Sequence, residues 1–307
     1  MSDTTASLRR KISSAGDLQS VVRTMKALAA SSIGQYEKSV RALGDYFRAV
    51  ELGLATCLRS RDPARLTPDR RTPADAMTTG VVVFGSDQGL VGQFNDTVAA
   101  FAVKTIDALP GEPRVWAVGE RVRSRLEDAG LSVVGLFAVP NSVQAITPLV
   151  GQILVEHENH DERGEPTELH LFHHRPSSRE GYAAVHQRLL PLDATWSREL
   201  VELSWPTKNP PEVMGNEVAT LRALISEYLF VSIFRACAES LASENASRLA
   251  AMQRAEKNID ELLEGLTHSF HRLRQAEIDE ELFDLVSGYE AMAAGPSPKK
   301  RHVKNPR

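Results

Sequence analysis

The sequence is poor in cysteine, with only Cys57 and Cys237 among its 307 residues. Two thiols on predicted helical segments do not form a disulfide framework of the kind that holds small secreted domains together. The sequence also has no run of about 18 apolar residues, and its first residues lack the apolar centre of a signal peptide. We therefore expect a soluble protein in a reducing compartment, with no membrane span.

Net charge and aromatic content are low as well. The formal net charge is −4 with both signs interspersed, so no broad basic field indicates a nucleic-acid partner. Aromatic residues make up 6% of the chain, which suits slim helical packing better than a large β core. A chain of this length with 42% hydrophobic residues can still hold two domains.

Proline is missing from a long stretch near the C-terminus, residues 217–289. Apolar or small residues recur there at alternating three- and four-residue steps, which average about 3.5 as in a coiled-coil seam. At about 1.5 Å of rise per residue, the predicted helix is on the order of 100 Å long. The predicted seam consists of Asn245, Leu249, Met252, Ala255, Ile259, Leu262, Leu266, Phe270 and Leu273.

A second stretch without proline, residues 8–58, shows the same spacing except for a stutter around Tyr36, which locally relaxes the supercoil. Its predicted seam consists of Leu18, Val22, Met25, Ala29, Ser32, Tyr36, Val40, Leu43, Phe47, Val50 and Leu54. Two such helices at opposite termini predict an antiparallel coiled-coil hairpin with a domain inserted at one end. A helical bundle is the alternative, but the middle of the chain supplies no further helices of similar length.

The residues between the two long helices alternate between strand and helix patterns. The predicted strands are 80–84, 114–118, 132–137, 168–173 and 183–190, and the predicted helices are 94–109, 121–129 and 142–157. This alternation is typical of a small parallel α/β layer with right-handed crossovers. The predicted fold class is therefore α/β, with a long antiparallel coiled coil of the terminal helices and an inserted Rossmann-like parallel α/β domain.

These patterns divide the chain into five segments. Three prolines and mixed charge in the second segment indicate an exposed linker, and the basic last segment is expected to be disordered. The segments are an N-terminal coiled-coil helix (1–60), a linker (61–78), the α/β domain (79–211), a C-terminal coiled-coil helix (212–292) and a basic tail (293–307).

A glycine-rich loop with Gly85, Gly89 and Gly92 follows the first predicted strand and precedes a helix. This is where α/β proteins hold phosphate groups. The loop nevertheless matches neither GxGxxG nor a P-loop, because no lysine followed by serine or threonine closes it. We therefore favour a tight strand-to-helix turn with close backbone packing over a nucleotide site.

Histidines offer the other candidate for chemistry. His157 and His160 are spaced i and i+3, whereas the zinc-protease motif requires i and i+4. His170, His173 and His174 follow, but the last two would point to opposite faces of a strand. Solvated surface histidines are therefore favoured over a metal site. No nucleophile motif accompanies them. The residues alone predict a scaffold or mechanical protein without catalytic, cofactor or metal residues.

Four ordered segments resemble the gamma subunit of F-type ATP synthases. They are 22–31 (VRTMKALAAS), 86–92 (SDQGLVG) with Asn95, 239–252 (ESLASENASRLAAM) and 274–282 (RQAEIDEEL). The resemblance spans residues 8–292. Asp279 stands where the family usually has threonine, and the chain extends past the usual end near Tyr289, which indicates a divergent or alternative F-type branch.

The resemblance implies the central rotor shaft of an F-type ATP synthase or ATPase. In that family the coiled coil threads a hexamer of alpha and beta subunits, and the α/β domain contacts the epsilon subunit and the c-subunit ring. Rotation of the c ring, driven by protons or sodium ions, turns the shaft, which takes each catalytic beta subunit through its nucleotide-binding states. The chain itself would be non-catalytic and bind no cofactor or nucleic acid. It would meet the membrane only through the complex, on the cytoplasmic face of the bacterial inner membrane.

The resemblance also assigns residues to contacts. Six would contact the beta subunit, with Glu244 and Arg248 lying beside Met25 and Lys26 on the opposing helix, and with Arg274 and Gln275 further along. Gly85, Asp87, Gly89 and Gly92 would form a turn of the foot domain. Small residues at 27 and 29–32 would keep the shaft narrow. The remaining alternative is an elongated structural adaptor with an α/β head that is unrelated to ATP.

Overall fold

The computed structural model describes residues 4–59, 78–109, 112–161, 167–177, 181–192, 194–209 and 211–293. Apart from residues 78 and 293, the predicted linker and basic tail lie outside these residues. The helices are α1 (Thr5–Arg59), α2 (Phe94–Ile106), α3 (Glu120–Asp128), α4 (Ile146–Asp161), α5 (Ala194–Val201) and α6 (Glu217–Ala293). The strands are β1 (Thr78–Phe84), β2 (Glu112–Val118), β3 (Val133–Phe137), β4 (Thr167–Ser177) and β5 (Gly181–Leu190).

Two compact parts make up the fold, residues 4–24 with 254–293 and residues 25–253. The first part pairs the start of α1 with the end of α6. The Thr5 hydroxyl donates to Glu277 at 3.1 Å, the Gln19 amide donates to Asp260, and Arg23 Nε lies 3.1 Å from Glu256 Oε1. The residue numbers of the partners on α6 decrease as those on α1 increase, so the two helices run antiparallel, as predicted.

The predicted seam is wrong at two positions of this first part. Leu18 is 57% exposed and Leu262 is 53% exposed. On α1 the covered positions are Leu8 and Ala15, with Gln19 partly covered one residue after Leu18. The Gln19 side chain reaches Asp260 of α6, so the face of α1 that meets α6 here includes residue 19 and leaves Leu18 in solvent.

In the second part the same two helices again run antiparallel. The Tyr46 hydroxyl donates to Glu227 at 2.8 Å, and Phe47 stacks on Tyr228 with ring centroids 5.6 Å apart. The predicted seam is confirmed here, since Ala29, Tyr36, Val50 and Leu54 are buried.

The inserted domain is one five-stranded sheet in the order β3-β2-β1-β4-β5. The first four strands are parallel, as predicted, whereas β5 pairs with β4 in the antiparallel direction. A parallel return needs a crossover of about a dozen residues or more. Only residues 178–180 separate β4 from β5, so an antiparallel hairpin is the only direction available.

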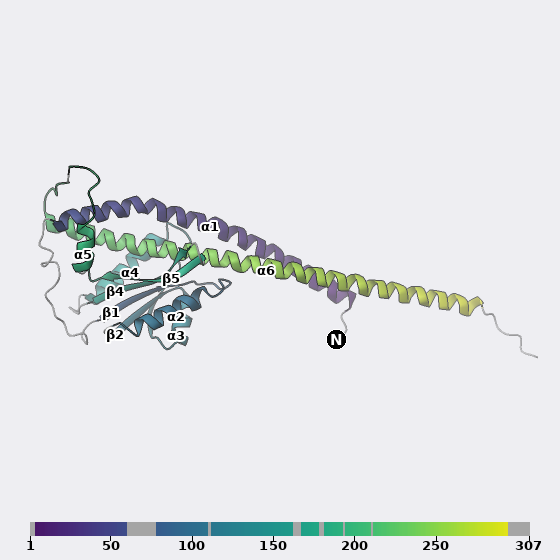
Figure 1. The fold of residues 1–307 in the computed structure, drawn as a ribbon. Coiled ribbons are helices and arrows are strands. Elements are labelled where there is room, and N and C mark those ends of the chain that lie inside the picture. Colours follow the sequence, from purple (N-terminus) through teal and green to yellow (C-terminus); the bar gives the residue numbers. More distant parts are fainter. Residues whose placement is uncertain are drawn as a thin grey trace, which may run out of the picture. The chain divides into compact units, whose positions relative to one another are not determined.

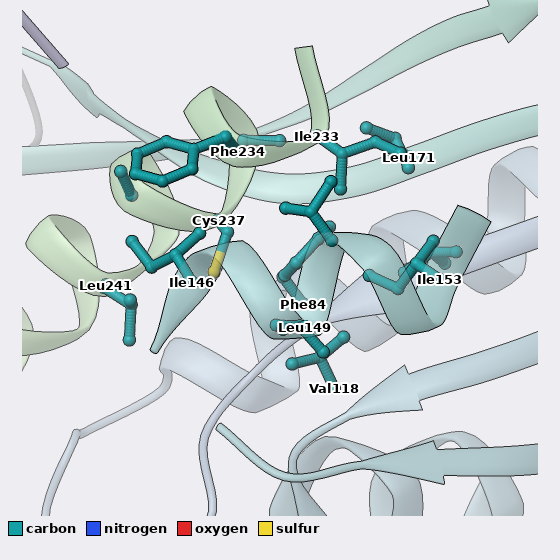
Figure 2. Packing of buried hydrophobic residues seen from close by; sticks show 14 of the residues in the cluster. Phe84, Val118, Ile146, Leu149, Ile153, Leu171, Ile233, Phe234, Cys237 and Leu241 are labelled. Carbon is teal, nitrogen blue, oxygen red and sulfur yellow. The ribbon is translucent and has the colours of Figure 1, made fainter. Parts of the chain in front are cut away.

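Helices cover both faces of this sheet. Val81 and Val83 of β1 pack against α2 and α3 on one face. Val82 and Phe84 face the other way, toward α4 and α6, as the period-two alternation of a strand requires. Figure 2 shows side chains of α4 gathered with those of α6 and of the strands. The α/β domain therefore packs directly against α6 (Figure 1).

Two helices differ from the sequence prediction. The helix predicted from residue 142 begins at Ile146, because residues 141–145 form a bend and turn. The eight-residue α5 was not predicted, since so short a segment shows too little periodicity. None of the helices in the described part of the chain has an apolar stretch sufficient to cross a lipid bilayer.

Candidate functional site

The glycine-rich loop after β1 is a closely packed turn. A Cβ on Gly85 would lie 2.2 Å from Val122 Cβ and 2.7 Å from Asn95 Oδ1, so only glycine fits without displacing α3. The neighbouring Ser86 N–H donates to Asn95 Oδ1 at 2.9 Å, and the Asn95 amide donates back to Ser86 Oγ at 2.8 Å. These contacts agree with the close strand-to-helix turn that the sequence favoured.

Asp87 ties this turn to the two following crossovers. Its Oδ1 accepts the backbone N–H of Glu120 at 3.0 Å, and its Oδ2 accepts that of Val139 at 2.9 Å. Glu120 is the first residue of α3, where a carboxylate satisfies an unpaired N–H and complements the helix dipole. Asp87 therefore has a structural function that accounts for its place in the motif.

The end of the loop faces solvent. Leu90 is 61% exposed and has a left-handed backbone, with φ of 63°, as does Gly92, with φ of 57°. Gly89 lies beside the Arg121 guanidinium, because a Cβ there would be 4.0 Å from Arg121 Nη2. An exposed leucine in a backbone conformation that costs about 1–3 kcal/mol marks this loop as a candidate contact surface.

A polar pocket of about 210 Å³ lies where this loop meets the two long helices. Ser32 and Tyr36 of α1 line it, together with Asp87 of the loop and Glu244 and Arg248 of α6. The α1 residues beside Glu244 and Arg248 in this pocket are thus Ser32 and Tyr36, rather than the predicted Met25 and Lys26. The reason is the antiparallel register, in which residue numbers that sum to a nearly constant value face each other.

Glu244 is a buried carboxylate, 5% exposed, and Arg248 Nη2 lies 2.6 Å from its Oε1. Burial raises the pKa of Glu244 and outweighs the opposing effect of Arg248. Burial likewise raises the pKa of Tyr36, with Cys237 and Glu244 adding to the shift. Met25 and Lys26 are half-buried on α1. Their predicted contact with a beta subunit stays a prediction.

Glu239 is a second buried carboxylate of α6, which sequence reasoning did not single out. It is 4% exposed, and its two oxygens accept hydrogen bonds from three residues. Arg235 Nε donates to Oε1 at 2.8 Å, while His173 Nε2, at 3.1 Å, and Arg175 Nε, at 2.8 Å, reach Oε2. Burial opposes ionisation, but these three donors lower the pKa of Glu239 to about 2. The only available signal was its place in segment 239–252.

The histidines are buried, which corrects the expectation of solvated surface histidines. His157, His170, His173 and His174 are each at most 7% exposed, and the side chain of His160 lies outside the described residues. The expected split between neighbours is confirmed, since His173 faces Glu239 of α6 while His174 Nε2 donates to the Phe94 carbonyl at the start of α2. Burial lowers the pKa of His174 to about 4, so its ring is neutral at neutral pH.

A third histidine belongs to a stacked pair between the last two strands. His170 Nδ1 lies 2.7 Å from His186 Nε2, and its Nε2 lies 2.9 Å from Glu168 Oε2. With both ring nitrogens of His170 engaged, the pair acts as a cross-strand link. Within the described residues, no three or more histidine, cysteine or acidic side chains are arranged to hold a metal ion.

Arg274 and Gln275 lie in the other compact part, where both are exposed on α6. Arg274 lines a groove of about 870 Å³ together with Arg9, Arg10 and Glu277. Three arginines give this groove a basic rim, which suits an acidic partner segment.

Beyond this groove, the end of α6 exposes a stripe of large apolar side chains. α1 begins at Thr5, which contacts Glu277, so the later residues of α6 extend past the start of α1. No described segment covers the stripe, whose members are 50–80% exposed. These members are Ile278, Leu282, Phe283, Leu285, Val286, Tyr289 and Met292. A stripe of this size on a soluble surface marks an interaction site.

Comparisons with known proteins agree on one family. The family model described as ATP synthase matches residues 4–292. The ATP synthase gamma chain of Moorella thermoacetica is 27% identical over 289 residues, covering 93% of this chain and 98% of that protein. The gamma chain of Mycobacterium sp. strain KMS is 29% identical over 317 residues, covering 95% and 98%.

Solved structures show the same fold. A chain of the Euglena gracilis mitochondrial ATP synthase in rotational state 3 superposes with a TM-score of 0.62 at 16% identity, covering 98% of both chains. A chain of the central stalk and c ring of the Tetrahymena thermophila mitochondrial enzyme gives 0.54 at 18% identity, covering 76% of this chain and 99% of that one.

Proposed function

Because the chain belongs to the ATP synthase gamma family, we propose that it is the central rotor shaft of an F-type ATP synthase or ATPase. The shaft couples ion-driven rotation of a c-subunit ring to the conformational cycle of catalytic beta subunits. Each angle of an asymmetric shaft offers different contacts to each beta subunit, and only such differential contacts can shift a conformational equilibrium.

One observation supports this proposal most directly, the exposed apolar stripe at the end of α6. Five of its residues recur at steps of four and three along one helix face, as in a helix that lies in an apolar sleeve: Ile278, Leu282, Leu285, Tyr289 and Met292. The chain itself leaves this face uncovered among its described residues, although it would be costly in water. A hexamer of alpha and beta subunits around the end of the shaft would supply the sleeve.

The remaining partners follow the same assignment. The α/β domain would contact the epsilon subunit and the c ring, and the exposed Leu90 loop is a candidate for such a contact. Nucleotide chemistry would take place on the beta subunits rather than on this chain. The complex would hold the chain at the membrane surface, on the cytoplasmic side in a bacterium, without any segment of its own in the bilayer.

Co-expression with the alpha and beta subunits of the same organism tests the assignment. We expect the full chain to co-purify with both and ATP hydrolysis to require the assembled complex. A probe fixed to the α/β domain should rotate in one direction during hydrolysis. If the chain co-purifies with neither subunit, the rotor assignment is wrong.

Arg274 and Gln275 provide a sharper test within the complex. Replacing both by alanine should slow ATP hydrolysis by the complex, because their predicted hydrogen bonds to a beta-subunit loop are lost. Unfolding of the isolated chain should be unchanged, since both side chains are exposed. Arg272→Ala is the matched control, an exposed arginine on the same helix outside the motif. Equal effects of the two changes would contradict the assigned contact.

A further inference from the structure

A rotor must pass turning force between its α/β domain and its shaft, so that force has to cross the contact between the domain and α6. The contact between the sheet, α4 and α6 is largely apolar. Apolar contacts are non-directional, so they oppose separation of two surfaces much more than sliding of one along the other. Hydrogen bonds and ion pairs, which are directional, therefore fix the angle of the domain about α6.

The Glu239 network is one of these directional contacts, and its carboxylate is 4% exposed. His173 and Arg175 lie two residues apart on β4 and so share the face toward α6. Both reach one oxygen of Glu239, while Arg235 of α6 holds the other oxygen and fixes the rotamer of the carboxylate. Since burial lowers the pKa of His173, its ring is neutral and donates through Nε2.

A second directional contact lies eight residues further along α6, about 12 Å at the rise of an α-helix. Ser247 Oγ donates to the Val91 carbonyl of the loop after β1, and it lies 3.1 Å from the Tyr182 hydroxyl of β5. The two anchors use different strands and different chemistry. Together they hold the domain at two points along the helix, and the first of them carries charge.

We propose that Glu239 is the joint through which turning force passes between the α/β domain and α6. This inference rests on the proposed rotor function, because a static adaptor would need no such joint. The carboxylate is a positioning residue that touches no nucleotide. Its loss leaves the apolar contact in place but lets the domain turn through a wider angle against the helix.

The test measures the angular spread of a probe in the assembled, hydrolysing complex. One probe is attached at Ser124→Cys on α3 of the domain, and in a second preparation at Asp45→Cys on α1 of the shaft. Both positions are exposed, whereas the native Cys57 and Cys237 are buried, so the introduced thiol takes the label. The spread during each pause reports the stiffness between the hexamer and the labelled position.

Glu239→Gln keeps the shape of the side chain and removes its charge. We expect the spread of the domain probe, taken as its angular variance, to rise by up to about twofold, because loss of one of two equal anchors halves the stiffness. The spread of the shaft probe should not change. Glu168→Gln is the matched control. Like Glu239, Glu168 is a buried carboxylate, but it lies on β4 and pairs with His170 inside the domain.

Each outcome decides between the alternatives. The proposal that Glu239 is the joint is wrong if Glu239→Gln leaves the angular spread of the domain probe unchanged. It is also wrong if the angular spread of both probes rises equally. Arg175→Met serves if Glu239→Gln fails to assemble, since it removes one exposed donor and leaves the carboxylate paired with His173 and Arg235. It should broaden the domain probe in the same direction, and no broadening there also overturns the joint. Absence of rotation in the unmodified complex refutes the rotor function instead.

Discussion

Neutralising Glu239 should lower the free energy of unfolding of the isolated chain by an amount that depends on pH. The perturbation is Glu239→Gln. The folded pKa of about 2 lies below the ordinary value of 4.5, so the ionised carboxylate stabilises the fold above pH 4.5, and this contribution is lost as the pH falls toward 2. The glutamine variant has no proton to bind and lacks this dependence.

The magnitude follows from the pKa difference. Each pKa unit corresponds to about 1.4 kcal/mol, so the contribution is about 3 kcal/mol at pH 7. At pH 3.5 part of the unfolded ensemble is already protonated, and linkage leaves about 2 kcal/mol. Other carboxylates titrate alike in both proteins, so their effects cancel in the difference between them.

Urea unfolding followed by far-UV circular dichroism and tryptophan fluorescence provides the measurement, at pH 7 and at pH 3.5. The difference in free energy of unfolding between the unmodified chain and Glu239→Gln should be about a third smaller at pH 3.5 than at pH 7, as the linkage predicts. Glu127→Gln serves as a control, because Glu127 forms an exposed ion pair with Arg123 and should show no measurable gap. A gap of equal size at both pH values, or none at pH 7, would refute the assigned hydrogen bonds.

Three further changes test other contacts. Gly85→Ala should destabilise the chain by about 1–3 kcal/mol in urea because its Cβ meets Val122, while Gly151→Ala, with free space around it, should cost nothing. Ala29→Leu should likewise lower the urea midpoint, since Ala29 is 2% exposed between the long helices, whereas Ala27→Leu on the exposed face should leave it unchanged. The Cys237 thiol should react with a thiol reagent only after unfolding, because it is fully buried and burial raises its pKa; rapid reaction of the native chain would contradict this.

The sequence predicted most of the architecture because the relevant signals are local. The absence of proline and a steady apolar period specify the two long helices whatever packs against them. Strand patterns that alternate with helix patterns specify the four parallel strands. The close turn at Gly85 was also predictable, since only a short, glycine-rich connection fits between a buried strand and the next helix. Such features depend on residues within a few positions of each other.

Side-chain environments were less predictable. Which distant segment covers a position decided three outcomes that the sequence did not predict. Residue 19 rather than Leu18 faces the partner helix, the four histidines are buried, and of the small residues at 27 and 29–31 only Ala29 is buried. A histidine on a strand looks the same in sequence whether water or another helix lies above it. Its burial is decided by packing between elements.

Glu239 shows this division most clearly. By sequence it is one more acidic residue on a long helix, where exposed glutamates are common and contribute little. The fold brings it to His173, 66 residues away, and to Arg175, and it buries the carboxylate and the His173 ring while the Arg175 side chain stays half-exposed. The chain by itself determined that a helix and a strand would form. Only tertiary packing decided that the Glu239 carboxylate would be buried beside donors of the sheet, and a carboxylate removed from water needs such donors.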